Sequence, residues 1–386
     1  MTVALPTPTD ASLRNEVVDT VRRFVAREVI PQAAALERTD TFPEALVEQM
    51  REMGLFGITI PEELGGLGLD LLTYVAVIEE LAYGWMSLTG IVNTHTMLAT
   101  LLLHHGSEEQ QRRWLPSMAT GEKRGALSLS EPDAGSDTQN ISCRAVRDGE
   151  SYVVNGTKAW VTNGERAALV ALAARTEEGI STFVVEKEPG SSFEGIAVSK
   201  HVGKLGYKGV ETVEMAYTDH RIPAANLVGV PGRGLPQVLS VLEIGRINIA
   251  SRAVGVARAA FDAALEYAQV RTTFGKPIAE HQAIQLKIAD MATRLEAARL
   301  LTRNAAERKA AGLRCDVEAG MAKLFASETA LELATEAMRI HGGMGYTTEM
   351  PVERYYRDAP LMVIGEGTNE IQRLVIARGL LARARK

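Results

Sequence analysis

The sequence predicts an α+β fold in three parts: an N-terminal α-helical domain (residues 1–124), a middle antiparallel β domain (125–234) and a C-terminal domain like a four-helix bundle (235–386). Two observations lead to this division. Apolar residues recur every three or four positions before about Gly121 and again after Leu235, as on one face of a helix. Between these regions lie short apolar or alternating runs separated by glycines and charged clusters, which is typical of strands.

The first part reads as helical because apolar side chains keep a three- and four-residue spacing, at Val17, Val21, Phe24 and Val25 and again at Leu46, Val47, Met50 and Met53. One segment interrupts this pattern. Residues 60–68 read Ile-Pro-Glu-Glu-Leu-Gly-Gly-Leu-Gly, and three glycines with a proline do not continue a helix. We therefore expect a tight connecting loop there.

The middle part is predicted to be a set of short strands. The run Tyr152–Val161 contains Asn155-Gly156, a pair that tolerates positive φ, so we expect two strands joined by a type I′ hairpin turn. Further strand-like runs cover residues 168–174, 181–186 and 210–217, and the domain is expected to end near residues 231–234.

The last part returns to helical spacing. One helix is predicted from an apolar face that ends before Gly312, with members Ile284, Ile288, Met291, Leu295 and Ala298. A second helix is predicted to stop at Gly342-Gly343 and carries a face rich in alanine, with members Ala322, Phe325, Ala326, Ala330, Leu333, Ala334 and Ala337. Small residues on such faces let helices approach closely, as in a bundle.

Composition narrows the class of protein. The 386 residues exceed what one ordinary core holds, and 46% hydrophobic with 23% charged residues is typical of globular proteins. A net charge of -6 gives no basic surface for nucleic acid. Cys143 and Cys315 lack the spacing of a disulfide framework or a metal site. We expect a soluble, cytoplasmic protein, because residues 1–10 show no targeting signal and the longest apolar stretches, 97–103 and 167–174, fall short of the ~20 residues that span a bilayer.

The candidate chemical motifs are weak when each is taken alone. The tetrapeptide Gly365-Glu366-Gly367-Thr368 is more often a solvated loop, although its glycines allow close approach to a ligand and a helix starting near Thr368 offers free N–H groups. The segment 127–137 joins a short strand to a polar turn, and Trp160 is by default a core residue. Residues 271–276 read as a solvated basic break between helices. No Walker A or Gly-x-Gly-x-x-Gly motif occurs.

Taken together, these segments resemble the acyl-CoA dehydrogenase family across essentially the whole chain. Six motifs occur in the family's order: Ile-Pro-Glu-Glu-Leu-Gly-Gly-Leu-Gly at 60–68, Ser-Glu-Pro-x-Ala-Gly-Ser-Asp at 130–137, Asn-Gly-x-Lys-x-Trp-Val-Thr-Asn-Gly at 155–164, Arg-x-Thr-Phe-Gly-Lys at 271–276, His-Gly-Gly-x-Gly at 341–345 and Glu-Gly-Thr at 366–368. Each match is weak alone, but six matches in the family's order are together highly specific for this family.

The resemblance implies FAD as cofactor. It places Ser130 and the backbone around it at the flavin ring, packs residues 160–162 on the ring with Thr162 near N5, and puts residues 368–370 at the adenine dinucleotide. It also implies that Arg271, Gln282 and residues 339–343 reach the FAD of a neighbouring subunit, so that the protein is at least a dimer and in this family commonly a homotetramer built as a dimer of dimers. The implied FAD residues are Leu127, Ser130, Gly135, Ser136, Trp160, Val161, Thr162, Arg271, Phe274, Gln282, Arg339, Gly342, Gly343, Thr368, Asn369 and Glu370.

The resemblance also assigns a base. Glu366 matches the residue that removes the α proton of the acyl-CoA thioester, whereas the alternative position used by some members is Gly245, which cannot act as a base. The implied substrate residues are Asn93, Ser136, Glu243, Gly245, Arg246 and Gly367. Two positions depart from the family: Arg339 replaces a frequent Gln, and Glu243 replaces a frequent Asp.

The acyl tail is expected beside the helix around residues 85–95, which carries no Arg or Lys that could pair with a distal carboxylate. His95 on this helix is interpreted as a packing histidine. Electron-transfer flavoprotein is the implied electron acceptor. Two alternatives stay open: an acyl-CoA oxidase or flavin monooxygenase on the same fold, in which O2 takes the electrons, and a non-catalytic protein that binds flavin or acyl-CoA.

Overall fold

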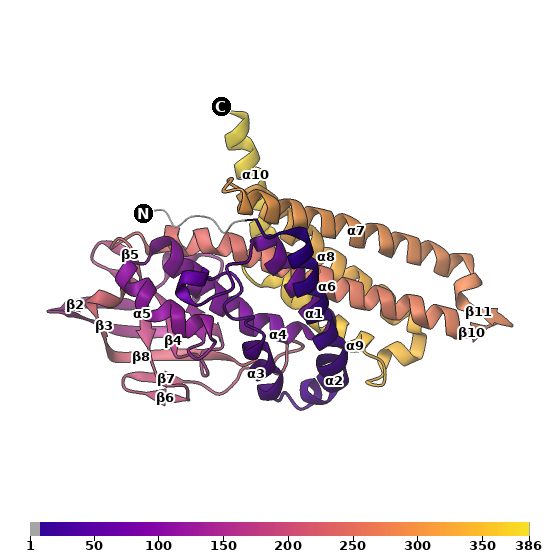
Figure 1. Ribbon diagram of the computed structural model, residues 1–386, viewed down its shortest axis with the longest axis horizontal. Coiled ribbons are helices and arrows are strands. Elements are labelled where there is room, and N and C mark those ends of the chain that lie inside the picture. The colour runs from indigo at the N-terminus through magenta and orange to yellow at the C-terminus, as the bar shows by residue number, and fades with distance from the viewer. Residues whose placement is uncertain (1–7, 386) are drawn as a thin grey trace.

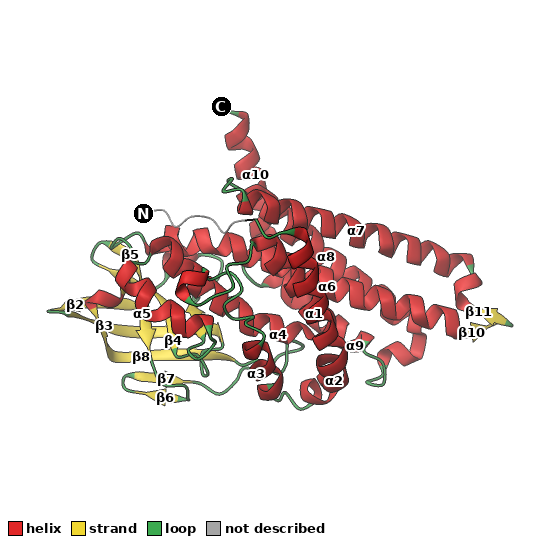
Figure 2. Cartoon of the chain, in the orientation of Figure 1, coloured by secondary structure: helices red, strands yellow, loops and turns green. Residues whose placement is uncertain are grey.

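The computed structural model describes residues 8–385, which form a helical part, a sheet and a second helical part in chain order (Figures 1 and 2). Most of the 1–10 stretch lies outside the described residues. The N-terminal helices are α1 (Ala11–Phe24), α2 (Ile30–Arg38), α3 (Glu44–Glu52), α4 (Leu71–His105) and α5 (Glu108–Ala119), and the stretch 60–68 is a loop with a single 3-10 turn at Glu62–Leu64. The predicted helices and the predicted loop of this region are therefore confirmed.

The middle part is one large sheet. Its strands are β1 (Gly125–Ser128), β2 (Arg144–Asp148), β3 (Ser151–Thr162), β4 (Leu169–Thr176), β5 (Gly179–Glu186), β6 (Ser192–Phe193), β7 (Ile196–Val198), β8 (Thr212–Pro223) and β9 (Leu227–Val228). They lie in the order β6-β7-β8-β3-β2-β4-β5-β9, with β1 paired to β4. Most pairs are antiparallel as predicted, but β4 pairs in parallel with β1 and, at one residue pair, with β2. Parallel pairing is possible here because two strands and their connections, rather than a tight turn, separate β1 from β4.

The predicted hairpin at Asn155-Gly156 is wrong, because β3 runs without a turn from Ser151 to Thr162. The long strand β8 pairs with both halves of it, and the register shifts between Val154 and Gly156. Gly156 has a φ of 146°, and a Cβ there would lie 2.6 Å from the Cα of Cys143. Glycine is therefore needed for a bulge and for close approach of the neighbouring strand, not for a turn.

The C-terminal part contains α6 (Gly234–Val270), α7 (Gln282–Ala310), α8 (Asp316–His341), α9 (Val352–Ile364) and α10 (Asn369–Ala384). The basic break predicted at residues 271–276 forms a small hairpin of β10 (Thr272–Thr273) and β11 (Lys276–Pro277). The alanines of α8 are fully buried against neighbouring helices, as expected for a bundle, at Ala319, Ala322, Ala326, Ala330, Ala334 and Ala337. One hydrophobic core joins the N-terminal helices to this bundle.

Helix α4 connects the helical parts and is more apolar than the sequence stretches suggested. With 35 residues it is long and apolar enough to cross a membrane by length and composition, and 83% of the apolar window is buried inside the protein. The expectation that every apolar segment falls short of that length is therefore wrong. Its burial is that of a core helix, and Trp85 with φ -159° and ψ 110° interrupts its helical geometry.

Candidate active site

Glu366 lies in the short turn between α9 and α10. Glu366 and Gly367 both have a left-handed backbone, with φ of 54° and 88°. Thr368 then caps α10, and its Oγ1 accepts a hydrogen bond of 3.4 Å from the N–H of Ile371. Part of Glu366 reaches the surface, but its carboxylate oxygen Oε2 is buried and has no hydrogen-bond partner among residues 8–385. The turn thus directs a carboxylate into the protein.

Two helices, α4 and α6, approach this carboxylate of the α9–α10 turn. Asn93 on α4 donates its Nδ2–H to Oε1 of Glu366. On α6, Gly245 leaves space for the carboxylate, since a Cβ at this position would overlap Oε2. Asn93 and Gly245, which the resemblance placed at the substrate, therefore lie at the two oxygens of the Glu366 carboxylate, and Gly367 follows Glu366 in the same turn.

The surroundings of Glu366 raise its pKa above the ordinary value of a glutamate. Burial is the main cause, because it disfavours the charged form. Arg252 opposes this most strongly, followed by the hydrogen bond from Asn93 and by the charges of Lys323 and Arg246. A carboxylate whose pKa is raised accepts a proton more readily than one in water.

Sequence reasoning missed the buried polar groups behind Glu366. Arg252 on α6 is 3% exposed. Its Nε–H donates to Oδ1 of Asn248 over 2.6 Å, and Nδ2 of Asn248 donates to the hydroxyl of Tyr74 over 2.6 Å. The one available signal was the presence of Arg252 and Asn248 in a helical stretch whose other members are small or apolar.

The predicted flavin segments 127–136 and 160–162 lie side by side at the ends of β1 and β3. The N–H of Ala159 donates to the carbonyl of Ser130 over 2.9 Å. The fully buried Lys158 donates to the carbonyl of Leu129 over 2.9 Å and to Oε1 of Glu131 over 2.8 Å. This ion pair holds the loop of residues 129–131 against β3.

Trp160 is 63% exposed, so the default interpretation of a core residue is wrong for it. Its φ of 61° coincides with a second register shift of β3, between Lys158 and Val161, which turns the indole outward. An exposed flat ring beside a loop of backbone polar groups fits a flavin ring, which needs an apolar face and hydrogen bonds at its edge. The residues present therefore fit FAD.

A second group of predicted FAD residues lies at the opposite end of the molecule. Arg271 follows the end of α6, Phe274 lies in the turn between β10 and β11, and Gln282 begins α7. Figure 1 shows this end of the molecule far from the sheet. The region of residues 339–343 ends α8 at the same place, where the rings of Tyr267 and His341 stack 4.2 Å apart. Phe274 is 96% exposed. Within one chain the two groups do not meet.

The remaining predicted residues have varied surroundings. Arg246 is buried near Glu366 and its Nε has no hydrogen-bond partner within the described residues, whereas Glu243 accepts a hydrogen bond of 2.7 Å from Lys309. Asn369 is buried, and its side chain bonds to residues of α8.

Other predicted residues lie at the surface: Gly135, Ser136, Gly342, Gly343 and Glu370 are exposed. His95 is buried, accepts the N–H of Gly125 over 3.1 Å, and burial lowers its pKa to about 4, as expected for a packing histidine.

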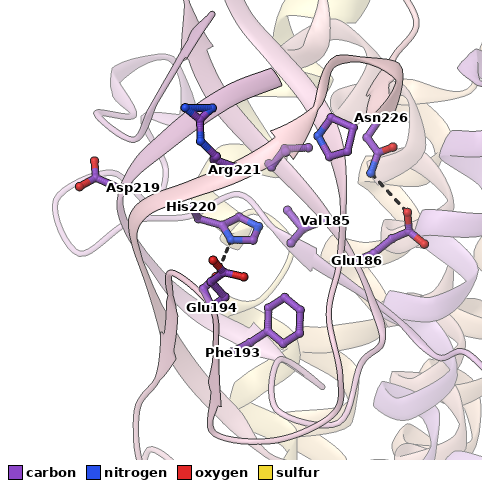
Figure 3. Close-up of a pocket in the computed structure, with 10 residues that line it drawn as sticks. Val185, Glu186, Phe193, Glu194, Asp219, His220, Arg221 and Asn226 are labelled. Carbon is purple, nitrogen blue, oxygen red and sulfur yellow. Dashed lines mark hydrogen bonds between the residues drawn. The ribbon is translucent and has the colours of Figure 1, made fainter. Parts of the chain in front are cut away.

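One hollow of the sheet domain contains none of the predicted residues. A cavity of about 560 Å³ lies between β5, β8 and the β6–β7 hairpin (Figure 3). His220 in it donates its Nδ1–H to the carbonyl of Glu194 over 2.8 Å, and Glu186 pairs with Arg113. These groups already have partners, so the cavity is a weaker candidate than the buried carboxylate. Among residues 8–385 no cluster of His, Cys, Asp and Glu could hold a metal ion.

Three family models cover the chain in order: the acyl-CoA dehydrogenase N-terminal domain at residues 13–122, the middle domain at 126–220 and the C-terminal domain at 232–381. Among relatives, an acyl-CoA dehydrogenase of Bacillus subtilis is 42% identical over 94% of this chain and 96% of its own. The short-chain specific acyl-CoA dehydrogenase of Mus musculus is 44% identical over 94% of this chain and 88% of its own.

Solved structures agree over nearly the full length. Butyryl-CoA dehydrogenase from Megasphaera elsdenii matches with a TM-score of 0.93 and 33% identity, covering 97% of this chain and 100% of its own. A structure described under the electron transferring flavoprotein of Acidaminococcus fermentans matches with a TM-score of 0.93 and 36% identity. The match covers 97% of this chain and 99% of its own. Glutaryl-CoA dehydrogenase from Mycobacterium smegmatis in complex with FADH2 matches with a TM-score of 0.90 and 29% identity. The match covers 96% of this chain and 95% of its own. The chain therefore belongs to the acyl-CoA dehydrogenase family and is an oxidoreductase that uses FAD to dehydrogenate an acyl-CoA.

Proposed function

We propose that Glu366 is the general base that removes the α proton of the acyl-CoA thioester, while the β hydrogen leaves as a hydride, giving the trans-2-enoyl-CoA. The observation that carries this proposal is the buried oxygen Oε2 of Glu366, which has no hydrogen-bond partner in the described part of the chain and belongs to a carboxylate with a raised pKa. An α C–H beside a thioester is a very weak acid, so its removal needs a strong and well-placed base.

The chain's own residues prepare this step. Asn93 orients the carboxylate through Oε1, which leaves Oε2 free for the proton. Arg252, Lys323 and Arg246 favour the ionised form that a base requires. We also propose that the backbone N–H of Glu366 binds the thioester oxygen, where negative charge develops. When bound, FAD supplies the acceptor for the hydride equivalent.

We further propose a short acyl chain as substrate. The supporting facts are the names of the relatives, short-chain specific acyl-CoA dehydrogenase and butyryl-CoA dehydrogenase. The neighbourhood of Glu366 is also densely packed, because the hydroxyl of Tyr207 fills the space where a Cβ of Gly90 would lie and Met97 contacts Asn93. Trp85–His95 itself carries no cation, but Arg252 approaches from α6, so glutaryl-CoA belongs in any substrate test.

For the electron acceptor we propose electron-transfer flavoprotein. A structure described under an electron transferring flavoprotein, which this chain matches with a TM-score of 0.93, supports it. The oxidase or monooxygenase alternative predicts rapid reoxidation by O2. A protein that only bound flavin or acyl-CoA would have no need of the buried Glu366 carboxylate.

The decisive experiment is anaerobic flavin bleaching. Short straight acyl-CoAs, such as butyryl-CoA, are expected to reduce the bound flavin, and a panel of longer, branched, cyclic and glutaryl thioesters defines the preference. The reduced enzyme is expected to reoxidise slowly in air and rapidly with electron-transfer flavoprotein. Fast peroxide formation would favour an oxidase, and no bleaching by any acyl-CoA would favour a binding protein.

We propose that the FAD site is completed by a second copy of the chain. The two groups of predicted FAD residues lie at opposite ends of one molecule, so one chain cannot bring both to a single FAD. A dimer can bring the two groups of residues to one FAD, and the homotetramer that the family implies would pair two such dimers. The cytoplasmic location stays a prediction.

The dependence of activity on pH tests the charges around Glu366. Since the base acts in its ionised form, the rate of flavin reduction is expected to rise with pH through a pKa above that of an ordinary glutamate. Arg252→Gln removes the largest charge that lowers this pKa and is expected to move the acidic limb to higher pH. The measurement is kcat/KM across pH. An acidic limb that stays in place would contradict the assigned role of Arg252.

A further inference from the structure

Lys323 is a buried cation on an otherwise apolar helix face. It is 0% exposed and lies on α8 in the same stripe as Ala319, Ala322 and Ala326. A lysine is almost never fully buried unless its ammonium group is satisfied by partners. Its position inside the bundle therefore requires a specific set of acceptors.

The ammonium group donates three hydrogen bonds, and all of them go to the polypeptide around Glu366. Lys323 Nζ donates to the carbonyl of Val363 over 3.1 Å, to the carbonyl of Gly367 over 3.0 Å and to Oδ1 of Asn369 over 2.8 Å. Val363 is in the last turn of α9, and Asn369 is the first residue of α10. One side chain thus joins the two helices on either side of the turn.

The turn needs such support because its backbone is strained. Glu366 has a left-handed φ of 54°, a conformation that is unfavourable for a residue with a Cβ. Gln372 adds a second attachment, with its Nε2–H bonded to the carbonyl of Gly367 over 3.0 Å and to that of Glu366 over 3.4 Å. Of these two side chains, only Lys323 bonds to residues of both α9 and α10. Strained backbone of this kind persists where the surroundings hold it.

We propose that Lys323 is a positioning residue of the active site: its three hydrogen bonds clamp both ends of the 365–368 turn and so hold the Glu366 carboxylate between Asn93 and Gly245. This inference rests on the proposed role of Glu366 as the base. Lys323 does not touch the carboxylate, and it acts through the carbonyls and the amide that frame it.

The charge of Lys323 has a second effect on the same group. It lowers the pKa of Glu366, after Arg252 and the hydrogen bond from Asn93. The other charges that face the ammonium are Glu366, Glu370, Glu328 and Arg246, and burial lowers its own pKa to about 8. The clamp therefore combines geometry with a field that favours the ionised base.

The test compares Lys323→Met with Ser327→Ala in the FAD-loaded enzyme. Methionine keeps the length of the side chain but removes three donors and the charge. Ser327 lies one turn along α8 and its hydroxyl also donates to Oδ1 of Asn369, over 3.2 Å, yet it contacts neither carbonyl of the clamp. We expect Lys323→Met to slow flavin reduction at saturating acyl-CoA by about 10²-fold, the cost of a base displaced by about 1 Å, and to move the acidic limb of the pH profile upward. Ser327→Ala is expected to retain the wild-type rate and limb.

Gln372→Met separates geometry from charge, and it keeps the test informative if Lys323→Met does not fold. It removes the second attachment of the turn without removing a cation, so a lower rate with an unmoved acidic limb is expected. Lys323→Arg, which restores a cationic donor, is expected to recover part of the rate lost in Lys323→Met. Flavin content and thermal unfolding are measured for each variant.

A folded, FAD-loaded Lys323→Met enzyme with the wild-type rate and pH profile would overturn the proposal. So would an equal loss of rate in Ser327→Ala, because it would indicate general packing of α8 rather than a clamp. Failure of the proposed function looks different: the wild-type flavin would then not be bleached by any acyl-CoA.

Discussion

Glu366→Gln is expected to slow flavin reduction by acyl-CoA at least about 10²- to 10⁴-fold, the range typical of the loss of a general base. The amide keeps nearly the same shape and still meets Asn93 and Gly245, but it cannot accept the α proton. Because the fold and the FAD site are left intact, the variant should still bind acyl-CoA and FAD. The loss should therefore appear in the rate of reduction, measured by anaerobic stopped-flow absorbance, rather than in affinity.

A matched control is Glu349→Gln, which changes an exposed glutamate before α9 that has no part in the proposed site. Its reduction rate should equal that of the wild type. Full bleaching of the Glu366→Gln flavin at the wild-type rate would show that another group removes the proton, and the proposed mechanism would have to be abandoned.

Gly245→Ala is expected to reduce activity by about 10²-fold without lowering stability. The added Cβ would overlap Oε2 of Glu366, so the carboxylate has to move away from its place between Asn93 and α6. A displacement of about 1 Å at a reacting group can cost this much in rate. Alanine is favoured over glycine inside a helix by roughly 1 kcal/mol, so the unfolding temperature should stay the same or rise.

A double-mutant cycle identifies the cause of this loss. In a Glu366→Gln background, where the base is already absent, Gly245→Ala should reduce the rate little further, because both changes act through the same carboxylate. Equal effects of Gly245→Ala in the two backgrounds would instead indicate a separate contact with the substrate.

The layout of the fold could be predicted from the sequence because it depends on local periodicity. The three- and four-residue spacing of apolar residues indicated the helices before Gly121 and after Leu235, and the structure confirms both regions. The Asn155-Gly156 pair shows the limit of such reasoning. Its preference for positive φ was recognised, but whether that φ serves a turn or a bulge depends on β8, a partner about 60 residues away that pairs with both halves of β3.

The candidate site could be predicted in part. The order of six motifs pointed to Glu366, and the structure brings Asn93 and Gly245, from helices far apart in the chain, to its carboxylate. By contrast, Trp160 reads as a core residue from its type alone, and only the register shift of β3 turns its ring outward. Arg252 and Lys323 were not found, because a charged residue in a helical stretch is ordinarily solvated.

By itself the sequence determined the helix–sheet–helix order and the family, and it pointed to Glu366 as the candidate base, since these follow from local spacing and from motifs that are contiguous in the chain. The tertiary structure alone decided what surrounds that carboxylate. Burial, the unpartnered Oε2, the opposing charges of Arg252 and Lys323, and the space left by Gly245 arise from α4, α6, α8 and the α9–α10 turn meeting at one point. The pKa of a buried group depends on charges and solvent exclusion within a few ångströms in space, whatever their separation along the chain.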